Sequence, residues 1–199
     1  MMLVSAILTH HVKGMHMSQN LYEIPLTRID GQPATLGDFS GKVLLIVNVA
    51  SKCGLTKQYE GLEQLYRSKH ADGLEIVGMP ANDFAGQEPG SDAEIASFCS
   101  TNFDVTFPLF SKISVVGDAK HPLYQALTRA QPDAIGEGPM REKLKQYGMT
   151  PNPVPEVLWN FEKFLVGRDG KVVARFAPDV TAEDAALVTA VDQALAETK

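Results

Sequence analysis

The strongest hydrophobic pattern in the chain is a pair of short apolar runs that predict neighbouring strands of a buried sheet. The run 43–49 is almost entirely apolar and β-branched, as in a strand covered on both faces. Between it and the second run, 74–79, apolar residues recur at helical spacing: Leu55, Tyr59, Leu62 and Tyr66. We expect Thr56 to be the N-cap of this helix. Strand, helix and strand predict a parallel βαβ unit with a right-handed crossover.

Two hairpins are expected on either side of this unit. Strands within 21–36 flank Asp30-Gly31, a dipeptide that readily adopts the positive φ angles of a tight turn. Near the C-terminus, two strands within 161–176 flank a second turn, and a helix with Thr181 as its expected N-cap follows. Together these elements predict an α/β fold of the thioredoxin-like type, with a mixed central sheet flanked by helices and an N-terminal β-hairpin.

The middle of the chain predicts shorter elements. Ser91 begins a capping box, so a helix that carries Cys99 should start there. A short strand at 105–110 and a short helix at 122–129 are expected next. From about 130 to 156 prolines and glycines are frequent, and we interpret this stretch as a surface insertion with one or two helical turns rather than as a domain.

Length and composition favour one domain. The 199 residues are 44% hydrophobic, enough for one sizeable core, which we place at 21–199 behind a flexible extension at 1–20. The net charge of −6 and the lack of a basic run disfavour nucleic acid and anionic membrane surfaces as partners. No run reaches the roughly 18 apolar residues of a membrane span. Two distant cysteines form neither a disulfide framework nor a metal motif, so a reducing, cytoplasmic location is expected.

Cys53 is the residue with the clearest chemical potential. It follows the first buried strand and precedes the predicted helix, so unpaired N–H groups and the positive end of the helix dipole should favour its thiolate form. Lys52 and Lys57 add positive charge nearby. The alternative is a small buried core residue, because free cysteine is among the most buried residue types. The local pattern leaves both interpretations open.

Three longer motifs carry a resemblance to a known family. They are Asn48-Val49-Ala50-Ser51-Lys52-Cys53-Gly54-Leu55-Thr56, Pro80-Ala81-Asn82-Asp83-Phe84 with Gln87-Glu88-Pro89, and Trp159-Asn160-Phe161-Glu162-Lys163-Phe164. In this order and spacing they resemble the glutathione peroxidases, from about residue 21 to the C-terminus. The resemblance implies a thioredoxin-like fold and a peroxidatic cysteine that reduces hydroperoxides without a cofactor. It implies that Cys53 is the attacking thiol, Trp159 an indole donor and Asn160 an amide donor.

The second cysteine makes the chain similar to the thioredoxin-dependent branch of that family. In this branch a resolving cysteine attacks the sulfenic acid, and thioredoxin reduces the resulting disulfide. Cys99 matches the resolving position, and its helix would have to open to meet Cys53; the alternative is a static core residue. Two other functions stay open, a peroxide sensor that relays oxidation to a partner protein and a one-cysteine peroxidase that uses glutathione. The oligomeric state is not determined by the sequence.

The chain departs from the usual family pattern in the loop after the second strand. Asp83 stands where glutamine is usual, and Ala81 where many members have cysteine. A carboxylate close to Cys53 would repel its thiolate, so the resemblance alone does not define the role of Asp83 at this site. We expect the loop to turn Asp83 away, toward solvent or a basic side chain, because a solvated carboxylate costs little free energy.

Overall fold

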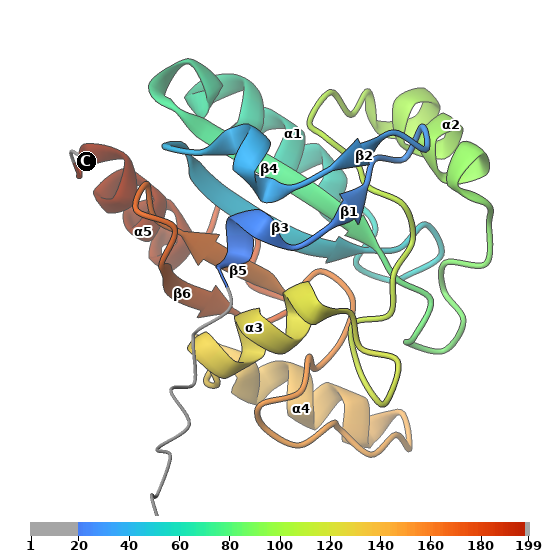
Figure 1. Cartoon of the computed structure of the whole chain (residues 1–199). Coiled ribbons are helices and arrows are strands. Elements are labelled where there is room, and N and C mark those ends of the chain that lie inside the picture. The colour runs from blue at the N-terminus through green and yellow to red at the C-terminus, as the bar shows by residue number, and fades with distance from the viewer. Residues whose placement is uncertain (1–19, 198–199) are drawn as a thin grey trace, which may run out of the picture.

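The computed structural model describes residues 20–197, and its centre is a four-stranded mixed sheet (Figure 1). The strands are β3 (Val43–Val49), β4 (Leu74–Pro80), β5 (Lys163–Val166) and β6 (Val172–Phe176), in the spatial order β4-β3-β5-β6. β3 pairs in parallel with β4 and antiparallel with β5, which forms a hairpin with β6. The predicted mixed sheet is therefore confirmed.

Helices cover both faces of this sheet. Those of the described residues are α1 (Gln58–Lys69), α2 (Asp92–Phe103), α3 (Pro122–Ala130), α4 (Glu137–Gln146) and α5 (Ala185–Ala196), with short 3-10 helices at Leu21–Glu23, Leu36–Phe39 and His70–Asp72. Alternate residues of β3 point to opposite faces. Leu45 and Val47 belong to the core cluster that includes residues of α1, α2 and α5, whereas Leu44 and Ile46 belong to the cluster with α3 and the N-terminal segment. Each such side chain contributes about 1.5–3 kcal/mol on burial.

The N-terminal hairpin is confirmed, with shorter strands than expected. It consists of β1 (Leu26–Thr27) and β2 (Pro33–Ala34), and Gly31 in its turn has a φ of 88°. The residues before β1 form a 3-10 helix that is capped by the Asn20 side chain. The extension predicted at 1–20 lies outside the described residues except for Asn20. The division into that extension and one domain at 21–199 stays a prediction.

Two local predictions are wrong. The stretch 105–110 forms no strand, because it contributes only isolated bridges at Leu109 and Phe110, and Pro108 lacks the N–H that a continuous ladder needs. The N-cap of α5 is Asp184 rather than Thr181. The Asp184 carboxylate accepts the N–H of Ala186 at 2.8 Å, so a better placed acceptor takes the capping role.

The stretch 130–156 contains a full ten-residue helix, α4, rather than one or two helical turns. The segments on either side of this helix are fastened to the sheet by Arg175 of β6, which forms a buried ion pair with Glu162. The Arg175 guanidinium also donates to four carbonyl oxygens, those of Gln131, Pro132, Pro155 and Glu156. Met140 and Leu144 of α4 are buried in a cluster with Leu158. That this stretch is an insertion stays a prediction.

Within residues 20–197, no helix combines the length and the apolar character that a membrane crossing requires. The same residues contain no cluster of three or more His, Cys, Asp or Glu side chains arranged to hold a metal ion.

Candidate active site

The loop after β3 places Cys53 at the carboxyl end of the central strand. The hydroxyl of Thr56 accepts the N–H of Cys53 at 3.0 Å and donates to the carbonyl of Ala50 at 2.9 Å. These bonds close the loop and occupy the Thr56 side chain, so the prediction that Thr56 caps the following helix is wrong. Lys57 holds the N-cap position of α1, and its side chain makes no capping hydrogen bond.

The Cys53 thiol is half-buried and lies against a backbone donor. Its Sγ accepts the N–H of Leu55 at 3.3 Å. A backbone N–H held in this position stabilises negative charge on sulfur, and the positive end of the α1 dipole acts in the same direction. Part of the side chain stays accessible to a substrate. Cys53 is therefore not an enclosed core residue, because its side chain is partly exposed and lines a cavity.

Trp159 and Asn160 are held beside this loop by hydrogen bonds to β3. The Asn48 side chain donates from Nδ2 to the Trp159 carbonyl at 3.0 Å, and the N–H of Phe161 donates to the Asn48 carbonyl at 2.6 Å. Phe161 has a φ of 67°, in the left-handed region that bulky residues seldom adopt. Trp159 and Cys53 line one cavity of about 130 Å³.

Gln87 is a polar residue that lines the same cavity. Its role was not predicted from the sequence. The carboxamide of Asn160 is fully buried and donates from Nδ2 to Gln87 Oε1 at 2.9 Å. Because Oε1 of Gln87 is occupied, its NH₂ group is the part that can donate into the cavity. The N–H of Lys52 donates to the Gln87 carbonyl at 3.0 Å, which fixes this loop to the Cys53 loop. Asn160 therefore stands behind Gln87 and does not line the cavity.

Asp83 points away from the cavity that Cys53 lines. Its carboxylate accepts the hydroxyl of Ser114 at 2.8 Å and the N–H of Val115 at 2.7 Å. Asp83 lines a separate cavity of about 160 Å³, and Trp159 forms part of the wall of both. As expected, the loop turns Asp83 away toward solvent, where its side chain is exposed, and its hydrogen-bond partners are a hydroxyl and a backbone N–H. Asp83 thus does not supply the amide donor usual at this position.

Cys99 is fully buried on α2 and does not line the cavity with Cys53. Its neighbours belong to the core cluster that also contains Tyr59. Burial raises the pKa of the Cys99 thiol to about 11, although contact with Tyr59 opposes this effect. Both cysteines are free thiols. The structure therefore keeps the two sulfur atoms in different environments.

The remaining wall of the cavity comes from α4 and the residues that follow it, which the sequence reasoning treated as a surface feature. This wall consists of Met140, Lys143, Leu144, Tyr147 and Met149. Met140 and Leu144 lie one turn apart on the helix and are buried. Their spacing is the one signal in the sequence that could have indicated an inward face.

Comparisons with known proteins show what the chain is similar to. The sequence model of the family described as glutathione peroxidase matches residues 21–128. The thioredoxin/glutathione peroxidase BtuE of Escherichia coli (strain K12) is 49% identical over 183 residues, which are 91% of this chain and 100% of that protein. The hydroperoxy fatty acid reductase gpx1 of Synechocystis sp. (strain ATCC 27184 / PCC 6803 / Kazusa) is 45% identical over 172 residues, 84% of this chain and 94% of that protein.

Solved structures show the same fold. The crystal structure of T. cruzi GPX1 matches with a TM-score of 0.64 at 31% identity, over 91% of this chain and 99% of that one. A thiol:disulfide interchange protein of the thioredoxin family from Chlorobium tepidum TLS matches with a TM-score of 0.58 at 13% identity, over 86% of this chain and 92% of that one. The second match shows the fold alone, and it confirms the thioredoxin-like architecture.

Proposed function

Because the chain belongs to the glutathione peroxidase family, and is thus a thiol peroxidase that reduces hydroperoxides, we propose that Cys53 is the attacking thiolate and that thioredoxin recycles the enzyme through Cys99. The observation that carries the proposal is the single cavity lined by Cys53, Gln87 and Trp159. It combines a partly accessible thiol with two neutral N–H donors, which is the set of groups that peroxide cleavage needs.

In the first step the Cys53 thiolate attacks the outer oxygen of the hydroperoxide. An S–O bond forms and the O–O bond breaks, so the sulfur is oxidised to a sulfenic acid and the alkoxide takes a proton to leave as an alcohol. The amide of Gln87 and the indole N–H of Trp159 are suited to stabilise the alkoxide while its charge develops. Asn160 acts as a positioning residue, because its hydrogen bond fixes the orientation of the Gln87 amide.

In the second step the Cys99 thiol attacks the sulfenic sulfur of Cys53. The S–S bond forms, the S–O bond breaks, and water leaves with the proton of the Cys99 thiol. A disulfide needs Cα atoms within about 7 Å and accessible sulfur atoms, so α2 must open locally to release Cys99 from the core. Thioredoxin then reduces the disulfide by thiol exchange. The name of the E. coli relative, a thioredoxin/glutathione peroxidase, supports this choice of reductant.

Two variants test the proposal. Cys53→Ser should abolish peroxide consumption, whereas Cys99→Ser should still react once with peroxide but lose turnover with thioredoxin. In the unmodified protein, one equivalent of peroxide should remove both free thiols per chain and leave an intramolecular disulfide in the mass spectrum. Thioredoxin-coupled turnover that persists in Cys53→Ser would refute the role of that residue.

A one-cysteine reaction with glutathione is the second candidate, because Cys99 is buried and its thiol has a raised pKa. Mass spectra that show a Cys53 sulfenic acid beside a free Cys99 would favour it, and faster turnover with glutathione than with thioredoxin would decide it. A sensor role would instead give mixed disulfides with a partner protein and little turnover. We place the reaction in the cytoplasm, where sparse cysteine use and recycling by thioredoxin are compatible.

A further inference from the structure

The wall that α4 builds beside Cys53 is apolar with one exception. Met140 and Leu144 are buried in it, and Met149 and Tyr147 continue the apolar surface toward solvent with 37% and 65% exposure. Lys143 is the one charged side chain among the described residues that line this cavity. A cation at the rim of an apolar cavity suits a ligand that is apolar along most of its length and anionic at one point.

Lys143 also differs from the other basic residues of its helix. Arg141 pairs with Glu137 at 3.1 Å, and Lys145 pairs with Glu142 at 2.7 Å. The ion pairs among the described residues include none with Lys143, although its helix is rich in charge. Its ammonium group can therefore bind an incoming anion without first breaking an ion pair of the protein in this region.

We propose that Lys143 is a specificity-determining residue that binds the carboxylate of amphiphilic hydroperoxides, such as those derived from fatty acids. The inference rests on the proposed role of Cys53 as the attacking thiolate. The cavity of about 130 Å³ has room for the peroxide group and a few adjoining carbon atoms. The rest of the apolar chain then lies over Tyr147 and Met149, and its anionic end reaches the flexible side chain of Lys143.

The charge of Lys143 and the apolar surface beside it make separable contributions to the rate constant with an amphiphilic hydroperoxide. An acid and its methyl ester cover the same apolar side chains, so their difference in rate isolates the contact with Lys143. Because Lys143 is exposed, the ion pair should be worth about twofold to fivefold in rate constant. Salt should reduce this preference, since exposed charges are screened over about 8–10 Å at physiological ionic strength.

The experiment compares the hydroperoxide of linoleic acid with that of its methyl ester, both dispersed in the same nonionic detergent, with hydrogen peroxide as reference. Single-turnover rate constants are obtained by quenched flow from the hydroperoxide remaining, without any reductant. Lys143→Met keeps the length of the side chain and removes its charge, and should lower the acid-to-ester ratio twofold to fivefold. Lys143→Arg should retain the ratio. The rate constant with hydrogen peroxide is measured for each protein, so that a general effect of the lost charge on the thiolate is separated from the acid-to-ester ratio.

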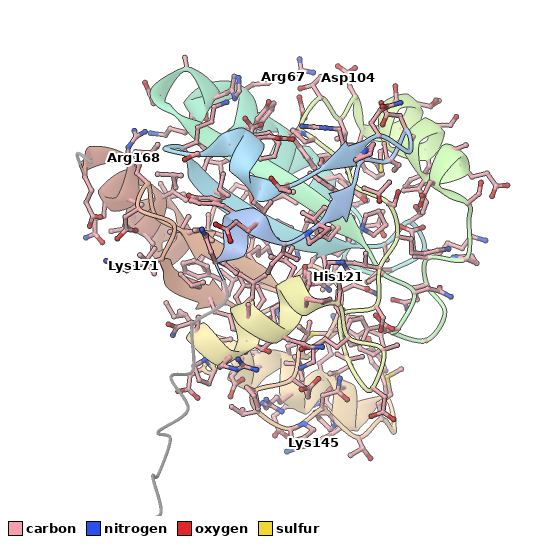
Figure 2. All side chains as sticks on the ribbon, viewed as in Figure 1. Arg67, Asp104, His121, Lys145, Arg168 and Lys171 are labelled. Carbon is pink, nitrogen blue, oxygen red and sulfur yellow. The ribbon has the colours of Figure 1, made fainter. Side chains whose placement is uncertain are left out.

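Lys145→Met is the matched control. Lys145 lies on the same helix at the outer surface, away from the cavity lining (Figure 2). An acid-to-ester ratio that stays the same in Lys143→Met, or falls equally in Lys145→Met, would overturn the inference. A wild-type protein that failed to react with hydrogen peroxide would instead refute the proposed role of Cys53, so the two failures are distinguishable.

Discussion

Replacing Gln87 tests whether its amide stabilises the alkoxide that leaves during peroxide cleavage. The Gln87 Oε1 atom accepts a hydrogen bond from Asn160 at 2.9 Å, which leaves the NH₂ group as the donor toward the cavity. Removing one such preorganised donor typically slows a reaction by about 10²–10³, equivalent to about 2.7–4 kcal/mol. Gln87→Met should show a loss of this size, because methionine has a similar length and no N–H.

Gln87→Glu adds a second effect to the loss of the donor. Two negative charges about 4 Å apart repel by about 4 kcal/mol at an effective dielectric of 20, and Gln87 and Cys53 line the same cavity, so this variant should react still more slowly. Stability should follow a different order. Glutamate keeps an oxygen that can accept the hydrogen bond of Asn160, whereas methionine leaves that buried amide unpaired at a cost of about 1–3 kcal/mol.

The assay is stopped-flow reaction of the reduced variants with hydrogen peroxide, together with urea unfolding of each protein. We expect wild type, Gln87→Met and Gln87→Glu in falling order of rate, but Gln87→Met as the least stable of the three. A role limited to supporting the loop would make rate and stability fall together. Gln87→Glu reacting within threefold of wild type would refute the assignment of Gln87 as a donor.

Three further predictions concern single residues. The Asp83 carboxylate accepts hydrogen bonds from Ser114 and Val115 and does not line the cavity with Cys53. Asp83→Asn should therefore change the rate constant with peroxide by less than about twofold, as measured by stopped flow. It should lower the free energy of unfolding in urea by about 1 kcal/mol. Burial lowers the pKa of Lys163 to about 7. Between about pH 7 and 10 the unfolded chain therefore holds a proton on Lys163 that the folded protein has released. The free energy of unfolding should rise over this range by at most about 1.4 kcal/mol per pH unit. Lys163→Met should flatten this slope in urea titrations at several pH values. Burial shields the Cys99 thiol and raises its pKa to about 11. At pH 8 iodoacetamide should therefore alkylate Cys53 but spare Cys99 until urea unfolds the chain. Peptide mass spectrometry identifies which cysteine is alkylated.

The sequence was informative where one local pattern is sufficient to determine a structure. The apolar run 43–49 has the length and composition of a central strand, and β3 occupies these residues. The capping box at Ser91 forms as expected, with hydrogen bonds in both directions to Glu94. Cys53 could be placed at the end of β3 for the same reason, because its position depends on the strand that directly precedes it.

The sequence was less informative where the outcome depends on a distant partner. The orientation of Gln87 is determined by Asn160, which lies 73 positions further along the chain, and no local pattern encodes that pair. Thr56 has the side chain of an N-cap, but the carbonyl of Ala50 and the N–H of Cys53 compete for its hydroxyl. The wall from α4 was missed because most residues of that helix are polar and only its packing near Trp159 shows its inward face.

α2 is bound to the core less tightly than α1, which determines how readily Cys99 can leave its buried position. The buried residues of α2 are Ile95 and Cys99, whereas five residues of α1 are buried. The large apolar side chains among them are Tyr59, Leu62 and Leu65 on α1 but Ile95 alone on α2. Each contributes about 1.5–3 kcal/mol on burial, so opening α2 uncovers fewer fully buried apolar side chains than detaching α1. The Arg67–Asp104 ion pair between α1 and the C-terminal end of α2 (Figure 2) adds little, because both side chains are exposed to solvent. Backbone amides of α2 should therefore exchange with deuterium faster than those of α1 in the reduced protein, and equal exchange in both helices would contradict a separate opening of α2.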